Sequence, residues 1–467
     1  MRIYNTLTRK IETLEPLEPD HLRLYTCGPT VYDFAHIGNF RAYVWEDLLR
    51  RSLKFLGYKV SQVMNITDVE DKIIARSIAE NRTLEEVTLP FIQAFFEDLD
   101  ALNIERAEHY PRATEHIAEM IEIARKLQAG GLTYASQGSL YFRIEAFPGY
   151  GRLSNLENRQ TRSGARVDSD EYDKEDARDF VLWKGHKPGE PSWDSPFGPG
   201  RPGWHLECSA MSMKYLGQCF DLHTGGVDNI FPHHENEIAQ SEGCTGASFV
   251  RYWMHVAHLL VDGEKMSKSK GNFYTLRNIL ERGHDPRALR FLLLSTHYRS
   301  PLNFTFAALA QATSEVHRLD DLNDRLDRAP AAEVCEGSDD TFDGKVDRAV
   351  EEFGAALADD LNISGANAAL FRLVRDAHVA LDRGGIPQSS RKRLRAALSR
   401  IDGVLGVMER PESEIDDEID DLIGQRNAAR KAGDYAEADR IRDDLAGRGI
   451  LLEDTAQGTV WKRRSPG

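Results

Sequence analysis

The first part of the chain carries short alternating stretches followed by an amphipathic one. Side chains at 21–27 alternate between apolar and polar, which predicts a strand that Gly28 and Pro29 end. An apolar face at helical spacing predicts a helix over about 40–56, and 59–66 has the pattern of a second strand. The order strand, loop, helix, strand indicates a βαβ unit and therefore a parallel sheet.

The middle of the chain interrupts this pattern. Residues at about 84–128 repeat apolar side chains at helical spacing, and 134–144 have the pattern of a hairpin. The stretch that follows is rich in Gly, Pro, Asp and Arg, and strand-like patterns return at 219–223 and 252–260. We therefore predict that about 115–203 is an insertion within a split nucleotide-binding domain.

The last third of the chain has a different character. Leu, Ala, Arg and Asp at helical spacing predict a helical bundle over 302–410. Residues 409–421 are typical either of a charge-rich linker or of the start of a helix. A further helix at 435–448 and a strand pair at 451–453 and 459–461 predict a small α+β domain.

Together these patterns predict an α/β protein with three parts. The first is a doubly wound parallel sheet of the Rossmann type over 1–301, divided by the insertion at about 115–203 and carrying a basic loop at 265–269. The second is the α-helical bundle at 302–410. The third is the small α+β C-terminal domain at 411–467.

Composition narrows the class of protein. The chain has 467 residues, and no apolar run reaches the ~20 residues that a membrane helix needs, so we expect no membrane partner. Residues 1–16 lack the apolar segment of a secretory signal, and the five cysteines form an odd, sparse set, so we expect a cytoplasmic protein. The net charge of −16 argues against sequence-independent binding of nucleic acid but permits local basic patches.

Two glycine-containing motifs could hold a nucleotide. Residues 36–39 (HIGN) precede a predicted helix, where backbone amides and polar donors suit phosphates and Gly38 permits a close approach. Taken alone, a turn with a helix-capping side chain explains this motif better. Residues 225–228 (GGVD) follow a predicted strand and could support a base or a ribose, although a two-glycine turn is weak evidence.

A third motif is cationic. Three lysines fall within the six positions 265–270 (KMSKSK), between Gly263 and Gly271. Such a loop can neutralise the charge of a departing pyrophosphate in a transition state. The alternative is a solvated basic turn, which is the usual explanation of a charge run.

A fourth set of residues suits a metal ion. Cys27, Cys208, His233 and Glu237 offer two thiolates, an imidazole and a carboxylate, and the last two are four apart on one predicted helix face. The paired spacing of a zinc finger is missing, so two buried cysteines and a solvated acidic helix start remain an alternative. That alternative also covers the other three cysteines, Cys219, Cys244 and Cys335.

The short sequence segments around these motifs resemble one protein family along almost the whole chain. HIGN and KMSKS are similar to the two signatures of class I aminoacyl-tRNA synthetases. More specific similarity to cysteinyl-tRNA synthetases lies in YTCGPTVYDFAHIGN, NITDVEDKI, DFVLWK, GRPGWHLECSAMS, FPHHENEIAQSE and GEKMSKSKGNF. The tail, DYAEADRIRDDLAGRGILLEDTAQGTVW, resembles the C-terminal domain of that family.

The resemblance implies roles for particular residues. The residues implied in catalysis are His36, Asn39, Lys265 and Lys268, and those implied in ATP binding are His36, Gly38, Gly225, Gly226, Asp228 and Lys268. The residues implied in cysteine binding are Thr67 and Trp204. The implied zinc ligands are Cys27, Cys208, His233 and Glu237. One position departs from the family pattern, because Asn39 stands where the signature usually has His. Asn keeps a donor but cannot be cationic, so its contact with phosphate stays open.

The resemblance also implies a two-step reaction. L-cysteine and ATP would give cysteinyl-adenylate and pyrophosphate, and the terminal ribose of tRNA(Cys) would then take the cysteinyl group. Zn²⁺, one per chain, would separate cysteine from serine, since it prefers a thiolate to an alcohol while a shape-based pocket separates near-isosteres by only ~10–200-fold. Mg²⁺ is expected with ATP, and the protein is expected to be a monomer.

Two other functions stay open at this point. A ligase that joins cysteine to an amino-sugar cyclitol in mycothiol synthesis would share the adenylate-forming site but would not need the tail at 422–467. A zinc-bearing RNA-binding protein without catalysis would need neither the lysine loop nor the GGVD turn. Cysteine-dependent pyrophosphate exchange and charging of tRNA separate the three.

Overall fold

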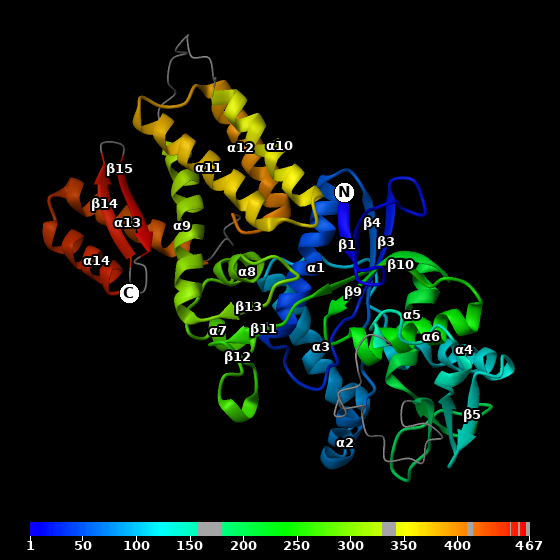
Figure 1. Cartoon of the computed structure of the whole chain (residues 1–467). Coiled ribbons are helices and arrows are strands. Elements are labelled where there is room, and N and C mark those ends of the chain that lie inside the picture. The colour runs from blue at the N-terminus through cyan, green and yellow to red at the C-terminus, as the bar shows by residue number, and fades with distance from the viewer. Residues whose placement is uncertain (157–178, 329–341, 409–413, 449, 456–457, 464–467) are drawn as a thin grey trace. The chain divides into compact units, whose positions relative to one another are not determined.

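A computed structural model gives the fold of the chain (Figure 1). The chain divides into two compact units, Met1–Met408 and Glu409–Gly467. The structure describes residues 1–156, 179–328, 342–408, 414–448, 450–455 and 458–463. Within these ranges, no helix combines the length and the apolar character that crossing a membrane requires.

The first unit is built on a parallel sheet of four strands in the order β10-β9-β3-β4. The strands are β3 (His21–Thr26), β4 (Lys59–Met64), β9 (Phe220–Gly226) and β10 (Val250–Val256). The chain first extends the sheet from β3 to β4 and later continues it on the other side of β3, at β9. The predicted doubly wound α/β fold is confirmed, and its topological switch point lies between β3 and β9, where such sheets bind ligands.

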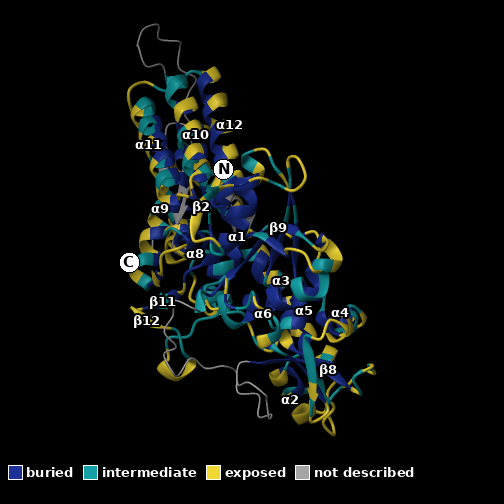
Figure 2. Ribbon diagram, turned by 45° about the vertical axis from the view of Figure 1, so that its right-hand side comes forward, coloured by how far each residue is buried: buried dark blue, intermediate teal, exposed yellow. Residues whose placement is uncertain are grey.

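Helices cover both faces of this sheet. On one face, Leu22 and Leu24 of β3 pack into a core with α1 (Ile37–Phe55). On the other face, Tyr25 and Val63 pack with α5 and α6. These two helices span Trp204–Leu216 and Glu235–Thr245. Since successive strand residues face opposite sides, the unbroken burial of 220–225 in β9 is what a sheet covered on both faces requires (Figure 2).

Two predicted helical stretches differ in their bounds from the structure. The helix predicted over about 40–56 begins at Ile37, because His36 and Asn39 form a capping box that starts the helix earlier. The stretch at 84–128 contains α3 (Leu84–Ala101) and α4 (Ile117–Ala129) rather than one run, and α2 (Asp71–Glu80) precedes them. Between α3 and α4 the chain forms isolated bridges to the edge of β4, such as Val63 with His109.

A second, antiparallel sheet interrupts the parallel one between β4 and β9. Its strands, in the order β5-β6-β7-β8, are Thr133–Ser136, Ser139–Phe142, Phe180–Gly185 and Gly200–Pro202. Residues 157–178 of the predicted insertion lie outside the described residues. Because β8 leads directly into α5, this sheet delivers Trp204 and Cys208 to the switch point.

A small sheet after β10 carries the lysine motif. Its strands, in the order β12-β11-β13, are Glu264–Lys265, Leu259–Val261 and Leu302–Phe304. The short helix α7 (Leu276–Leu280) follows the motif, and at the N-terminus β1 (Arg2–Asn5) pairs with β2 (Lys10–Thr13). The motif therefore projects from a pair of strands that the core of the first unit anchors.

Among the described residues, four helices lie within the bundle predicted at 302–410, and α8 (Pro286–Leu294) precedes it. The four are α9 (Phe306–Arg328), α10 (Phe342–Ala358), α11 (Ile363–Asp382) and α12 (Gln388–Leu405). Arg290 of α8 is fully buried and donates to the carboxylate of Asp47 on α1 and to the carbonyl oxygen of Leu405, 2.5 Å away. The end of the bundle is thus tied to the helix that starts at the HIGN motif.

The second unit has its own small core. It contains α13 (Glu414–Ala432), α14 (Tyr435–Gly447) and a hairpin of β14 (Ile450–Thr455) and β15 (Gly458–Arg463). Its buried residues include Ile419, Ile423, Ile441, Leu445 and Ile450. The described part of 409–421 follows the helical alternative, while 409–413 lie outside the described residues.

Candidate active site and metal centre

Four side chains that the sequence pairs with zinc come together at the switch point. Ligand atoms of Cys27, Cys208, His233 and Glu237 all lie within 4.8 Å of one another. Cys27 follows β3, Cys208 lies in α5, and Glu237 lies in α6. His233 belongs to the turn Ile230–His234, whose backbone leaves helical geometry before α6 begins. Three segments far apart in sequence, at Cys27, at Cys208 and at 233–237, therefore converge on one point.

The chemistry of this cluster fits a metal ion. Oε1 of Glu237 is buried and accepts no hydrogen bond from the described residues, although Nε2 of His233 lies 3.1 Å away. Two potential ligand atoms that face each other without a hydrogen bond are what a shared cation would satisfy. The hydrogen bond between the two thiols lowers the pKa of Cys208 to about 6 and raises the pKa of Cys27, so one thiolate forms readily.

A second combination of ligands overlaps the first. Cys27 and Glu237 also lie within reach of His223 and His234. Nε2 of His223, however, is hydrogen-bonded to Oε2 of Glu237 at 2.9 Å. The set with two thiolates is the softer one and leaves this hydrogen bond intact, so it suits zinc better.

Imidazole rings surround the cluster, and sequence analysis missed four of them. His205 bonds to His233 through their Nδ1 atoms at 2.9 Å, while His223, His234 and His255 lie on the other side. Burial lowers the pKa of His255 to about 3 and holds those of His205 and His234 well below the usual range, so these rings are neutral. Neutral rings that hydrogen-bond to ligands orient them. The available signal was their position at the ends of predicted strands and helices.

The two residues implied for cysteine flank the cluster. The indole of Trp204 stacks on His233 with ring centres 4.3 Å apart, and 38% of the Trp204 residue is exposed. The hydroxyl of Thr67 is buried; it donates to Oε2 of Glu207 at 3.2 Å and accepts from Nδ2 of Asn65 at 3.1 Å. An open aromatic face and a fixed hydroxyl thus border the metal ligands.

The HIGN motif forms a capped helix start. Nδ1 of His36 accepts a hydrogen bond from the backbone N of Asn39, whose Oδ1 accepts from the backbone N of His36, both at 3.1 Å. The capping role considered for these residues is therefore present. A Cβ on Gly38 would lie 3.0 Å from the terminal methyl of Met266, so glycine here lets the lysine loop approach.

The lysine loop lies against the HIGN motif. The ring of Phe273 contacts that of His36 edge-on at 5.2 Å. Lys268 begins a short turn, and its Nζ lies 2.5 Å from Oδ2 of Asp33. Lys265 is exposed at the end of β12, and the structure gives no contact between its side chain and the HIGN motif among the described residues.

The GGVD turn ends β9 beside the metal cluster. A Cβ on Gly225 would lie 2.8 Å from the ring of His234, so the backbone passes very close to that ring. The backbone N of Gly226 donates to Oδ1 of Asn229 at 2.9 Å. Asp228 is exposed, and its charge acts to raise the pKa of His36, against the larger lowering effect of burial. The turn and the HIGN motif therefore share one neighbourhood.

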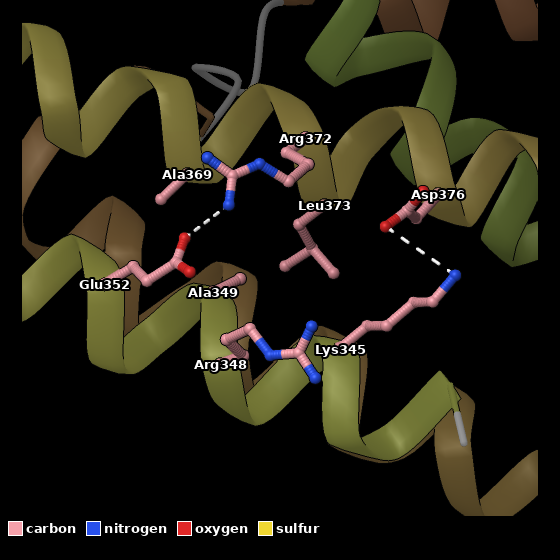
Figure 3. A pocket seen from close by; sticks show the side chains of 8 residues that line it. All are labelled: Lys345, Arg348, Ala349, Glu352, Ala369, Arg372, Leu373 and Asp376. Carbon is pink, nitrogen blue, oxygen red and sulfur yellow. Dashed lines mark hydrogen bonds and ion pairs between the residues drawn. The ribbon is translucent and has the colours of Figure 1, made fainter. Parts of the chain in front are cut away.

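A separate hollow lies between α10 and α11 of the bundle, with a volume of about 250 Å³ (Figure 3). Basic and acidic side chains line it in pairs: Arg372 with Glu352 at 2.5 Å, and Lys345 with Asp376 at 4.0 Å. None of the four motifs contributes to its lining. The candidate site is therefore the one at the sheet.

The parallel sheet with both signature loops at its carboxyl edge defines a class I aminoacyl-tRNA synthetase. Residues 13–314 match the family described as tRNA synthetases class I (C) catalytic domain. Residues 352–409 match the DALR domain, and residues 412–461 match the cysteinyl-tRNA ligase anticodon binding domain. The chain belongs to the cysteine–tRNA ligase family.

Individual proteins agree with this assignment. The cysteine–tRNA ligase of Leptospira interrogans is 50% identical, with 99% of each chain covered, and that of Solibacter usitatus is 48% identical, with 99% of this chain and 100% of the relative covered. Among solved structures, methionyl-tRNA synthetase of Mycobacterium tuberculosis with methionyl-adenylate has a TM-score of 0.58 at 16% identity, covering 83% of this chain and 90% of the other. A LeuRS–tRNA–LeuAMS complex from Agrobacterium radiobacter has a TM-score of 0.60 at 12% identity, covering 85% of each chain. These two likenesses support the fold.

Proposed function

We propose that the protein activates L-cysteine with ATP to cysteinyl-adenylate and transfers the cysteinyl group to tRNA(Cys), with zinc selecting cysteine. The observation that carries the zinc proposal is the buried Oε1 of Glu237, which faces His233 without a hydrogen bond from the described residues, beside two hydrogen-bonded thiols. A zinc ion held by Cys27, Cys208, His233 and Glu237 would supply a soft Lewis acid that binds a thiolate more strongly than an alcohol.

The residues around the ligands orient the amino acid. Trp204 offers its exposed face beside His233, so it can cover the short side chain of cysteine and exclude water. The hydroxyl of Thr67 is held by Asn65 and Glu207 in one orientation, which suits a fixed polar contact with substrate. Because both groups are fixed before substrate arrives, little ordering is needed on binding.

The other half of the site serves ATP. His36, Gly38, Gly225, Gly226 and Asp228 surround the carboxyl ends of β3 and β9, where a nucleotide can lie on the backbone of the glycines. Lys268, with Lys265 nearby in the chain, neutralises charge as the bond between the α- and β-phosphates breaks and pyrophosphate leaves. Mg²⁺ accompanies the phosphates. Asn39 caps the helix and supports the loop rather than carrying charge.

The division of the chain follows from these roles. Activation belongs to 1–301, with the insertion at about 115–203 carrying Trp204 and Cys208 towards it. The bundle at 302–410 and the tail at 411–467 serve tRNA, and the match of 412–461 to an anticodon binding domain supports the second assignment. We propose a monomer that works in the cytoplasm, in line with the sparse set of cysteines.

The test combines metal analysis with a specificity ratio. The purified protein should contain about one zinc per chain and should exchange pyrophosphate into ATP with cysteine at least ~10³-fold better than with serine, beyond the ~10–200-fold that shape provides. A protein purified without metal that keeps both its cysteine activity and its ratio would contradict the zinc proposal. Charging of a tRNA(Cys) transcript tests the second step separately.

A further inference from the structure

An ion pair joins the lysine loop to the loop before α1, in addition to the contact of Phe273 with His36. Asp33 lies between the exposed rings of Tyr32 and Phe34, three residues before His36. Its Oδ2 lies 2.5 Å from Nζ of Lys268, and its Oδ1 accepts a hydrogen bond from the backbone N of Phe34 at 2.9 Å. That backbone bond fixes the carboxylate, so it is the lysine that is free to move.

The position of Lys268 places this pair beside the expected phosphates. The ammonium lies 5.0 Å from the centre of the Phe273 ring, and the same ring contacts His36. The hydrogen bond that Lys268 donates to Asp33 raises the pKa of Lys268. Partial burial raises the pKa of Asp33, but the combined effect of Lys268 and the Phe34 amide lowers it by more, so the pKa lies below its usual value. Both groups are therefore charged at neutral pH.

A carboxylate at this place has a cost for nucleotide binding. The phosphates of ATP are anionic and compete with Asp33 for the ammonium of Lys268, so ATP can use this lysine only when the ion pair breaks. An ammonium has three donors and no fixed plane, so it can pass from a carboxylate to phosphate oxygens by rotation of its stem. Since 65% of the Lys268 side chain and 36% of the Asp33 side chain are exposed, solvent screens the pair, which is therefore weak enough to exchange.

We propose that Asp33 is a positioning residue that holds Lys268 beside the HIGN motif in the ATP-free enzyme and yields it to the phosphates when ATP binds. The pair keeps the loop docked and its lysine within reach, and ATP must break it. Asp33 thereby weakens ATP binding while it keeps the loop ordered. This proposal rests on the role proposed above for Lys268 in ATP activation.

The first experiment compares ATP affinity among matched variants. Asp33→Asn removes the charge and keeps the shape, so the Kd for ATP, measured by titration calorimetry, should fall about two- to five-fold, the range of an exposed ion pair. Glu264→Gln is the control, because it removes one charge from the Lys270 pair, 2.7 Å long, in the same loop. It should leave the Kd unchanged. An unchanged or higher Kd in Asp33→Asn overturns the proposal.

A double-mutant cycle shows whether Asp33 acts through Lys268. In a Lys268→Ala background, Asp33→Asn should shift the Kd for ATP by less than half of its effect in the intact chain, because the pair no longer exists. An equal or larger shift means that Asp33 acts on the phosphates directly, which overturns the positioning role. If Lys268→Ala alone changes neither ATP affinity nor adenylation, the proposed function of Lys268 fails instead.

A structural readout avoids activity altogether. Trypsin cleaves after lysine in mobile chain, so without ATP the Asp33→Asn protein should be cut after Lys268 faster than the unaltered chain, by about the same two- to five-fold. Glu264→Gln should not accelerate cleavage at that bond. Saturating ATP should remove the difference between Asp33→Asn and the unaltered chain. Equal cleavage without ATP would contradict the proposal.

Discussion

The metal cluster and the lysine loop are built on opposite principles. Cys208, His233 and Glu237 are almost wholly buried, come from two separate segments, and have neighbouring side chains that hydrogen-bond to His233 and Glu237. Lys268 is exposed and pairs with the partly exposed carboxylate of Asp33. Selection by a soft metal requires fixed ligand positions, whereas neutralising a departing group requires a charge that can follow it. In the proposed function, the rigid cluster selects the substrate and the mobile lysine follows the charge of the leaving group.

Removal of one thiol should have the largest effect. Cys208→Ala takes away a proposed ligand from a preformed set, so zinc content and cysteine-dependent pyrophosphate exchange should fall together, the latter by at least ~10³-fold. Metal analysis and the exchange assay measure the two on one sample. Cys219→Ala is the control, since Cys219 lies outside the cluster and should change neither. Loss of activity with full zinc content would show that Cys208 is not needed to hold the zinc.

Removal of the mobile charge at Lys268 should have the second largest effect on activity and should leave the zinc content unchanged. Lys268→Ala should lower the rate of adenylation by ~10²–10³-fold, the usual loss for one transition-state donor, with little change in the KM for cysteine. Zinc content should stay at the level of the unaltered chain. Lys270→Ala, which breaks the pair with Glu264, is the matched control and should cost far less. A mutant that instead loses cysteine binding would show that the loop contributes to amino-acid selection rather than to neutralising the leaving group.

Deletion of the second compact unit should affect only the second step. A chain that ends at Met408, where the first unit ends, should keep nearly full pyrophosphate exchange, because both the cluster and the lysine loop lie before that point. The kcat/KM for tRNA charging should fall by about tenfold or more, through weaker tRNA binding. Equal charging of tRNA(Cys) by both chains, with unchanged anticodon preference, would assign the tail another role.

The smallest effect should come from a change at Glu46, a buried residue beneath the sheet strand that leads to the cluster. Glu46 of α1 is buried, accepts a hydrogen bond from Oγ1 of Thr224 at 2.9 Å, and has its pKa raised by burial to about 8. A raised folded-state pKa means that its contribution to stability is present below pH 4.5 and is lost as pH rises to about 8. Glu46→Gln should therefore raise the Tm by a few degrees at pH 8 and by less at pH 5. An equal shift at both pH values would show that this carboxyl is already ionised or solvated.

Local patterns predicted the frame of the molecule well. The βαβ unit and the terminal hairpin are confirmed, because alternation and helical spacing report burial that each segment experiences by itself. The start of α1 was wrong by three residues, since a histidine as helix cap is an unusual choice. From the sequence, Trp461 beside the basic residues 462–464 suits either stacking on a tRNA base or filling the small core of this domain. It lies in β15, but its side chain is outside the described residues.

The site was predictable only in part. The family resemblance named the four proposed ligands, and the structure brings them together, while their role in binding zinc stays a prediction. The surrounding imidazoles were missed because His223 and His255 meet only through the parallel pairing of β9 and β10, which periodicity does not specify. The pair of Asp33 and Lys268 joins residues more than two hundred positions apart, so no local pattern could indicate it.

The most direct test of the central claim is to count the sulfur atoms around the metal. X-ray absorption at the zinc edge should show two Zn–S distances of ~2.3 Å in the protein alone, from Cys27 and Cys208. Addition of L-cysteine should raise the count to three, and addition of L-serine should leave it at two. A protein without zinc, or a sulfur count that L-cysteine does not change, would contradict selection of cysteine by the metal.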